Sequence, residues 1–220
     1  MTRAKSPARA KAPKRAPKKA PARASDAKAG AVVVHPVTPA RWDDLAKLFG
    51  PRGACAGCWC MWPRVTSAEF RAGNGDQRRR AFKRIVARGD RPGLIAYVGG
   101  EPAAWCAFGP RAEYRRLATS KTFAPVDDEP VWSVLCFFVA RPFRRRGLSV
   151  RLLEAAAAHA RARGARILEG YPTEPGSGRA ADAFVWTGLA SQFRRAGFSE
   201  VVRRSRTRPI MRRTLRARAR

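Results

Sequence analysis

The chain has 220 residues, of which 46 are Lys or Arg and 16 are Asp or Glu, so its formal net charge is +30. Hydrophobic residues make up 45% of the chain, which excludes a wholly disordered protein and allows one sizeable core. The sequence has no uninterrupted run of about 18 apolar residues and no apolar stretch near its start, so we expect a cytoplasmic protein that neither spans a membrane nor carries a secretory signal.

Residues 1–30 form a basic tail. They hold ten Lys and Arg against one acid, Asp26, and they contain no aromatic residue and no Leu, Ile or Val. Such a segment cannot bury enough apolar surface to offset the entropy of ordering it, so we expect it to be disordered. Its charge could contact nucleic acid nonspecifically through phosphates, or it could be a solubilising extension. A short basic end, 215–220, closes the chain.

The first part of the domain predicts one strand and two helices. The apolar run 31–35 is the strand, and Thr38 can cap a helix over 39–49 that has a proline next to the cap. Residues 67–88 favour a second helix, which the Gly-Asn-Gly sequence at 73–75 interrupts.

The middle of the domain predicts a hairpin and a buried strand. The runs 94–98 and 103–108 flank a turn that begins with Gly99 and Gly100, so we expect antiparallel pairing. Residues 131–139 (VWSVLCFFV) are almost continuously apolar, which is typical of a strand buried on both faces.

The last part of the domain predicts a parallel strand pair and a second hairpin. A helix over 148–163 joins the buried strand to a strand at 166–171, and such a βαβ unit pairs its strands in parallel. After a loop rich in glycine and proline, we expect a short helix at 189–196 and strands at 198–205 and 209–213.

A basic turn with one glycine leads into the helix over 148–163. The unpaired N–H groups and the positive dipole end of a helix start suit a pyrophosphate. Gly147 permits close approach of the ligand, and Ser149 is small enough to leave the first turn open. The arginines at 144–146 add charge, although a plain basic surface turn is the alternative in so arginine-rich a chain.

This turn and the order of elements around it resemble the GCN5-related N-acetyltransferase (GNAT) superfamily. The pyrophosphate loop of that superfamily reads Arg/Gln-x-x-Gly-x-Gly/Ala, and Arg144-Arg145-Arg146-Gly147-Leu148-Ser149 occupies its place here. The resemblance covers roughly residues 31–214, which we take as one N-acetyltransferase domain. It implies an α/β (α+β) fold of the GNAT-like acyl-CoA N-acyltransferase type, with a mixed, mostly antiparallel central sheet of about six to seven strands flanked by helices.

The resemblance also implies acetyl-CoA as co-substrate, bound where the strands at 131–139 and 166–171 separate. The acceptor would be an amine of a small molecule or peptide that attacks the thioester directly, and a homodimer is compatible with it. A strand amide near Phe138 or Val139 would polarise the thioester carbonyl. The residues implied to bind the cofactor are Phe137, Phe138 and Val139 along the pantetheine arm, and Arg144, Arg145, Arg146, Gly147, Leu148 and Ser149 at the pyrophosphate.

The catalytic acid and base are less clear from the sequence. Many superfamily members have an Asn and a Tyr before the last strands, where this chain has Trp186 and Phe193. Because Phe193 has no proton to give, the acid could be Tyr171 or water, or the thiolate could leave unprotonated. Glu169 could be a base whose pKa is raised by burial, or it could form a salt bridge with an arginine.

Two further groups of side chains have open interpretations. The acids Asp127, Asp128 and Glu129 could meet a cationic amine substrate or merely solvate their loop. Cys55, Cys58 and Cys60 could share a zinc ion, but neither His35 nor His159 is placed to be the fourth ligand, and His159 is most simply an ordinary helix residue. The cysteine segment could instead form an aromatic, thiol-lined wall of the acceptor pocket, or could simply pack in the core.

The sequence features are compatible with three classes of function. The leading class is an acetyl-CoA-dependent N-acetyltransferase. The second is a nucleic-acid-associated protein that uses the fold for binding, favoured by the charge of +30. The third is a cysteine-based metal or redox sensor.

Overall fold

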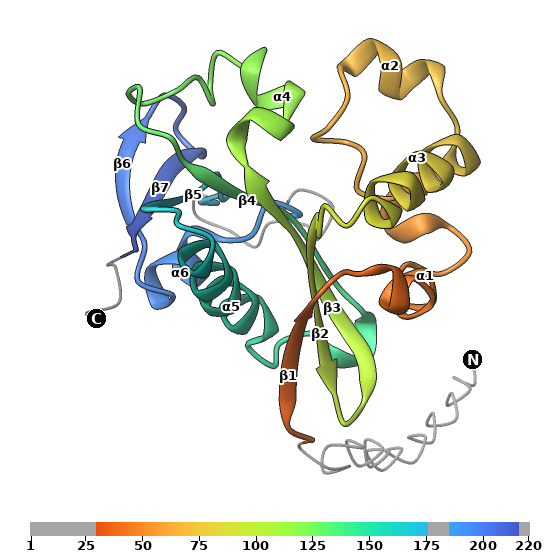
Figure 1. Cartoon of the computed structure of the whole chain (residues 1–220). Helices are drawn as coiled ribbons and strands as arrows, with labels where there is room; N and C mark the ends of the chain where they lie inside the picture. The colour runs from red at the N-terminus through yellow and green to blue at the C-terminus, as the bar shows by residue number, and fades with distance from the viewer. Residues whose placement is uncertain (1–29, 176–184, 216–220) are drawn as a thin grey trace, which may run out of the picture.

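The computed structural model describes residues 30–175 and 185–215, which form one sheet covered by helices (Figure 1). Within these residues the sheet has seven strands in the order β1-β2-β3-β4-β5-β7-β6. Five of the six neighbouring pairs are antiparallel, and β4 and β5 are parallel. The predicted mixed, mostly antiparallel sheet is therefore confirmed.

The N-terminal elements follow the sequence pattern with one difference. Thr38 makes no side-chain capping bond, and Pro39–Arg41 forms a 3-10 turn before the first α-helix. Tight turns of this kind are frequent at helix starts. The predicted interruption at 73–75 is present, since Asn74 caps the helix after it and its side chain accepts from the Gln77 amide at 3.0 Å. The elements are β1 (Val32–Pro36), α1 (Trp42–Phe49), α2 (Ser67–Ala72) and α3 (Gly75–Ala87).

The predicted hairpin is formed by β2 (Gly93–Val98) and β3 (Glu101–Pro110). Gly99 and Gly100 have φ of +59° and +85°, so the two-residue turn requires the left-handed region in which glycine alone is unstrained. A 3-10 turn, Arg111–Glu113, and a single helical turn, α4 (Arg115–Ala118), follow β3. Neither the 3-10 turn nor α4 was predicted from the sequence.

A β-bulge interrupts β4 (Trp132–Val139). Cys106 of β3 lies opposite Phe137 and Ala107 lies opposite Leu135, which leaves Cys136 without a partner and with φ of +46°. Leu135 and Cys136 therefore both face the layer of α1 and α3, whereas Phe137 faces the layer of α5 (Leu148–Ala162). A bulge bends its strand, and this one lies where β4 begins to leave its parallel neighbour.

The parallel partner of β4 is β5 (Ile167–Gly170), as predicted. The two strands pair over three positions, from Trp132 opposite Leu168 to Val134 opposite Gly170. Beyond this point β4 continues to Val139 while its pairing with β5 ends, so the sheet opens. The remaining elements are α6 (Ala190–Arg195), β6 (Ser199–Arg203) and β7 (Pro209–Thr214), with β7 inserted between β5 and β6.

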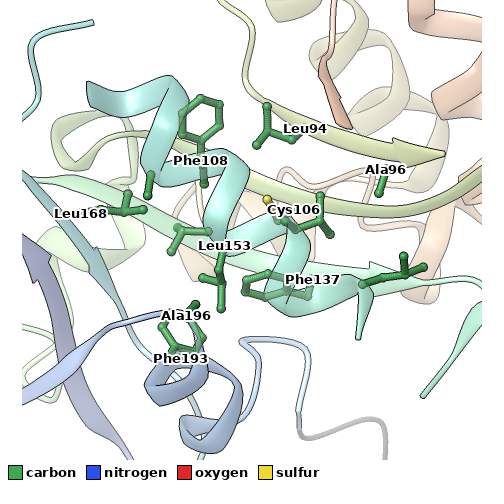
Figure 2. Packing of buried hydrophobic residues seen from close by; sticks show 14 of the residues in the cluster. Leu94, Ala96, Cys106, Phe108, Phe137, Leu153, Leu168, Phe193 and Ala196 are labelled. Atoms are coloured by element: carbon green, nitrogen blue, oxygen red, sulfur yellow. The ribbon is translucent and has the colours of Figure 1, made fainter. Parts of the chain in front are cut away.

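Two apolar layers cover the two faces of the sheet. One layer contains Leu153 of α5 with Cys106 and Phe137 of the sheet, and Phe193 and Ala196 lie beside them (Figure 2). Phe193 is fully buried, and its ring lies so close to Gly170 that a side chain at that glycine would overlap it. The other layer packs α1 and α3 against the opposite face through Leu45, Phe82 and Trp105, among others. The opening between β4 and β5 therefore lies between two rigid layers.

Candidate active site

The turn before α5 has the geometry of an anion site. Gly147 is the residue before the helix, with φ of +74°, and apart from its chain neighbours no atom of the described residues lies within 4 Å of the place where its Cβ would be. Among the described residues, no backbone carbonyl accepts a hydrogen bond from the amides of 145–149. These N–H groups and the positive end of a 15-residue helix can therefore receive a pyrophosphate.

The open edge of β4 presents alternate residues. The Ala140 amide donates to Ala103 at 3.0 Å, so by the alternation of an antiparallel ladder the Phe138 backbone also faces β3. Phe137 and Val139 consequently face the opening. The Val139 carbonyl accepts from Arg144 Nε at 3.1 Å, and the Phe137 amide donates to the Trp186 carbonyl at 2.6 Å. Of the three expected pantetheine-binding residues, two face the opening with their backbone and Phe138 does not.

Glu169 lies in an ion-pair network at the base of the opening. Its carboxylate is 1% exposed and accepts from Arg111 Nη1 at 3.2 Å, from Arg212 Nε at 2.7 Å and from the Tyr171 hydroxyl at 2.5 Å. Both carboxylate oxygens are therefore already engaged by donors of the protein. The structure thus places Glu169 in the salt bridge that the sequence offered as the alternative to a base.

Tyr171 shares this network and retains its proton. Its hydroxyl accepts from Arg111 Nη1 at 2.5 Å and lies 2.9 Å from Ser133 Oγ, while its own proton is directed to Glu169. Burial and the negative charge of Glu169 raise the pKa of Tyr171 above its usual range. A phenol whose pKa is raised is a weaker acid than a free one.

A cavity of about 270 Å³ lies beside the opening, between β4, the end of β5 and the segment after α1. Leu135 and Tyr171 line it from the two strands. Trp62 and Trp186 line it as a pair whose ring centroids are 4.4 Å apart, and the Arg116 guanidinium stacks 4.0 Å from the Trp62 ring. The remaining lining residues are Pro63, Ser67, Leu117, Thr119, Ser120, Phe123 and Thr187. Arg116 could not be singled out from the sequence, because arginine is abundant throughout the chain.

The acids considered for a cationic substrate are occupied elsewhere. Asp127 accepts two hydrogen bonds from Arg212, at 2.6 and 2.9 Å, and Glu129 lies 3.5 Å from an Arg166 nitrogen. Neither these two acids nor Asp128 is among the described residues that line the cavity. The structure therefore supports the alternative in which they solvate and tie down their loop.

The cysteine segment contributes to a buried thiol cluster behind β4. Cys60 Sγ lies 2.8 Å from Cys136 Sγ and accepts from Trp105 Nε1 at 2.8 Å. Hydrogen bonds from Cys136 and Cys60 lower the pKa of Cys58, whereas Cys55 is exposed. The structure thus pairs Cys60 with Cys136, whereas the Cys58 thiol donates to the Gly53 carbonyl at 3.7 Å. Over the described ranges, no set of three His, Cys, Asp or Glu side chains has the arrangement of a metal site.

The cluster lies in the aromatic layer of α1 and not in the cavity. Trp59 stacks on Trp42 with ring centroids 6.0 Å apart, and Phe49 meets the edge of Trp105 at 5.7 Å. Trp62 is thus the member of this segment that supports the expected aromatic wall of the acceptor pocket. His159 lies on α5 beside Phe108 at a ring distance of 6.3 Å, as an ordinary helix residue.

Comparison with known proteins identifies the class. Residues 59–184, more than half of the chain, match the acetyltransferase (GNAT) family. The chain therefore belongs to the GNAT family, and its activity is that of an N-acetyltransferase with acetyl-CoA as co-substrate. No curated protein sequence matches the chain. Across 30–175 and 185–215, no helix is long and apolar enough to cross a membrane.

Several solved structures are similar to the chain at low identity. An N-acetyltransferase from Staphylococcus aureus is 12% identical, with a TM-score of 0.49, covering 85% of this chain and 100% of its own. A protein from Salmonella typhimurium described as an acetyltransferase, solved with acetyl-CoA, is 15% identical, with a TM-score of 0.48 and coverages of 86% and 97%. A GNAT-family acetyltransferase from Streptococcus pneumoniae is 15% identical, with a TM-score of 0.47 and coverages of 84% and 99%.

Proposed function

We propose that this enzyme transfers the acetyl group to a primary amine that is held in the cavity beside the opening of the sheet, by direct attack while both substrates are bound. The observation that carries this proposal is the position of the cavity. It is lined by Leu135 and Tyr171, which flank the opening from β4 and β5. When bound, acetyl-CoA supplies the acetyl thioester for this attack.

The residues around the opening fit acetyl-CoA. The amides of 145–149 and the α5 N-terminus would hold the pyrophosphate, with Arg144, Arg145 and Arg146 adding positive charge. The backbone of Phe137 and Val139 would pair with the pantetheine arm. Their present partners, the Trp186 carbonyl and Arg144 Nε, are groups that a ligand amide can replace.

The Val139 amide is the group that we assign to carbonyl polarisation. By the alternation of β4 it points into the opening, whereas the Phe138 amide points to β3. An N–H fixed in a strand costs no reorganisation when negative charge develops on an oxygen beside it. Of the two amides expected to polarise the thioester carbonyl, those of Phe138 and Val139, we therefore propose that of Val139.

We assign no side chain in the opening as the acid. The Tyr171 hydroxyl donates its proton in a hydrogen bond to Glu169, and the buried Phe193 side chain has no proton to give. A thiol has a reference pKa near 8.5, so the leaving thiolate is stable enough to depart without a proton from the protein. As the C–N bond forms and the C–S bond breaks, the attacking nitrogen releases one proton, which passes to solvent water or to the CoA thiolate. Glu169 and Tyr171 are therefore proposed as positioning residues that hold the ends of β5 and β7 in place.

The test is the release of free thiol from acetyl-CoA by the purified full chain, with and without a panel of primary amines. We expect thiol release that depends on the amine, together with acetylated amine detected by mass spectrometry. If acetyl-CoA binds by calorimetry but no amine raises thiol release above the rate in buffer, the proposed transfer to an amine is wrong.

The tail remains a separate proposal, motivated by the net charge of residues 1–30, which lie outside the described residues except for Gly30. Deleting them should leave acetyl-CoA affinity unchanged and should flatten the salt dependence of nonspecific DNA binding, since each lost phosphate contact removes about 0.9 from the logarithmic slope. Fluorescence anisotropy with a labelled duplex measures the slope. Deleting 216–220, which carry three arginines, is the matched control and should flatten it less. An unchanged slope after deletion of 1–30 would rule out this contact.

A further inference from the structure

The cavity beside the opening has an unusual charge for a site that must hold an amine. Its one ionised side chain among the described lining residues is the guanidinium of Arg116. No Asp or Glu of the described chain lines it. Among the described residues, a protonated amine entering this space would meet a cation and no carboxylate.

Arg116 is held by two hydrogen bonds and has no acid partner in the part of the chain that the structure describes. Its Nε donates to the Trp62 carbonyl at 2.7 Å and its Nη1 donates to Ser67 Oγ at 2.7 Å. Within the described ranges, no carboxylate lies within 4.0 Å of it, whereas neighbouring Arg115 pairs with Glu69 at 2.7 Å. Burial and the positive charge of Arg71 lower the pKa of Arg116, as expected for a cation whose charge is not compensated.

The walls of the cavity are aromatic and hydroxylic. Trp62 and Trp186 form one side, Phe123 and Tyr171 form another with ring centroids 5.2 Å apart, and Arg116 stacks on Trp62 at the rim. Ring faces of this kind can stack on a flat apolar group. A fixed guanidinium can bind a carboxylate by donating two parallel N–H bonds to it. The aromatic walls and the guanidinium together fit a ligand that has both a flat apolar ring and a carboxylate.

We propose that the acceptor is an aromatic primary amine that also carries a carboxylate, as a free aromatic amino acid does, with its ring between the aromatic side chains and its carboxylate on Arg116. This inference rests on the proposed function and deepens it. Cationic polyamines and lysine side chains are disfavoured, because their charge would approach Arg116.

Arg116 can also take over part of the task of a general base, because its charge affects the protonation of the acceptor amine. A like charge nearby disfavours the protonated form of an amine, so Arg116 increases the fraction of acceptor that is neutral and able to attack. The carboxylate base that the sequence suggested, Glu169, is already used in two ion pairs. The pocket can therefore select the neutral amine without a side chain that removes the proton.

The experiment compares amino acids with their decarboxylated counterparts: phenylalanine with phenethylamine, tyrosine with tyramine, and tryptophan with tryptamine, and spermidine as the cationic amine. We expect kcat/KM for thiol release to be at least about tenfold higher for each amino acid than for its counterpart, with spermidine lowest. Equal values within each pair, or a preference for spermidine, would overturn the proposal without needing any variant.

Two variants test whether Arg116 causes the preference for amino acids over their decarboxylated counterparts. Arg116→Met should bring the ratio of kcat/KM between each amino acid and its counterpart close to one, whereas Arg115→Met, an exposed arginine outside the cavity, should keep the ratio. A ratio that survives Arg116→Met in a protein folded by circular dichroism would overturn the assignment of Arg116. Quenching of tryptophan fluorescence by each amino acid separates the two levels of the argument: quenching without thiol release supports the acceptor class and contradicts the proposed reaction.

Discussion

Gly147→Val is expected to reduce acetyl-CoA affinity by about a hundredfold or more. Gly147 has φ of +74°, which is strained for a β-branched residue, and its missing Cβ leaves the space through which a phosphate approaches the amides of 145–149. Losing two hydrogen bonds to a charged group costs about 3 kcal/mol or more, which corresponds to this factor. Isothermal titration calorimetry with acetyl-CoA measures it.

The control for this prediction is Arg145→Ala. Arg145 contributes charge through its side chain, and the proposed holding bonds come from the backbone, so we expect affinity to fall by less than about tenfold. Circular dichroism must show that both variants are folded. A folded Gly147→Val protein that binds acetyl-CoA like the parent would show that the pyrophosphate is held elsewhere.

Glu169→Ala is expected to lower the free energy of unfolding by about 3–5 kcal/mol. The substitution leaves Arg111 and Arg212, whose side chains are 15% and 12% exposed, without the buried carboxylate between them. It also removes the acceptor of the Tyr171 proton. Urea denaturation measures the loss, provided that the slope of the transition is unchanged.

Glu154→Ala supplies a matched control with the same change of side chain. Glu154 pairs with Arg151 at 3.3 Å on the exposed face of α5, and such surface pairs contribute about 0–1 kcal/mol. If the two variants lose the same small amount of stability, Glu169 does not hold β5 and β7 together. A loss confined to Glu169→Ala would support its positioning role.

Most of the fold could be predicted because its signals are local. The Gly99-Gly100 turn predicts the hairpin, the Gly-Asn-Gly sequence at 73–75 predicts the helix break, and the apolar run of β4 predicts the central strand. Each of these depends on residues a few positions apart. The pyrophosphate turn is equally local, and this is why the sequence could assign it to a family.

The parts that could not be predicted depend on distant residues. Cys60 meets Cys136 across 76 positions, and nothing in either neighbourhood specifies the other. Glu169 was recognised as a possible salt bridge, but its partners Arg111 and Arg212 could not be chosen among so many arginines. The insertion of β7 beside β5 decides these contacts, and strand order is a property of the whole sheet.

The bulge at Cys136 has a consequence for how the gene can change. Because Cys136 is an extra residue opposite the junction of Cys106 and Ala107, loss of its codon would leave Leu135 and Phe137 on the sides of the sheet that they occupy now. Loss of the Leu135 codon would have the same outcome, because Cys136 faces the same layer, whereas loss of a codon elsewhere in β4 would exchange the two sides for every residue beyond it. At this bulge the alternation of the core survives a shorter strand, and the loss would be the buried Cys136 thiol beside Cys60 together with the bend of β4.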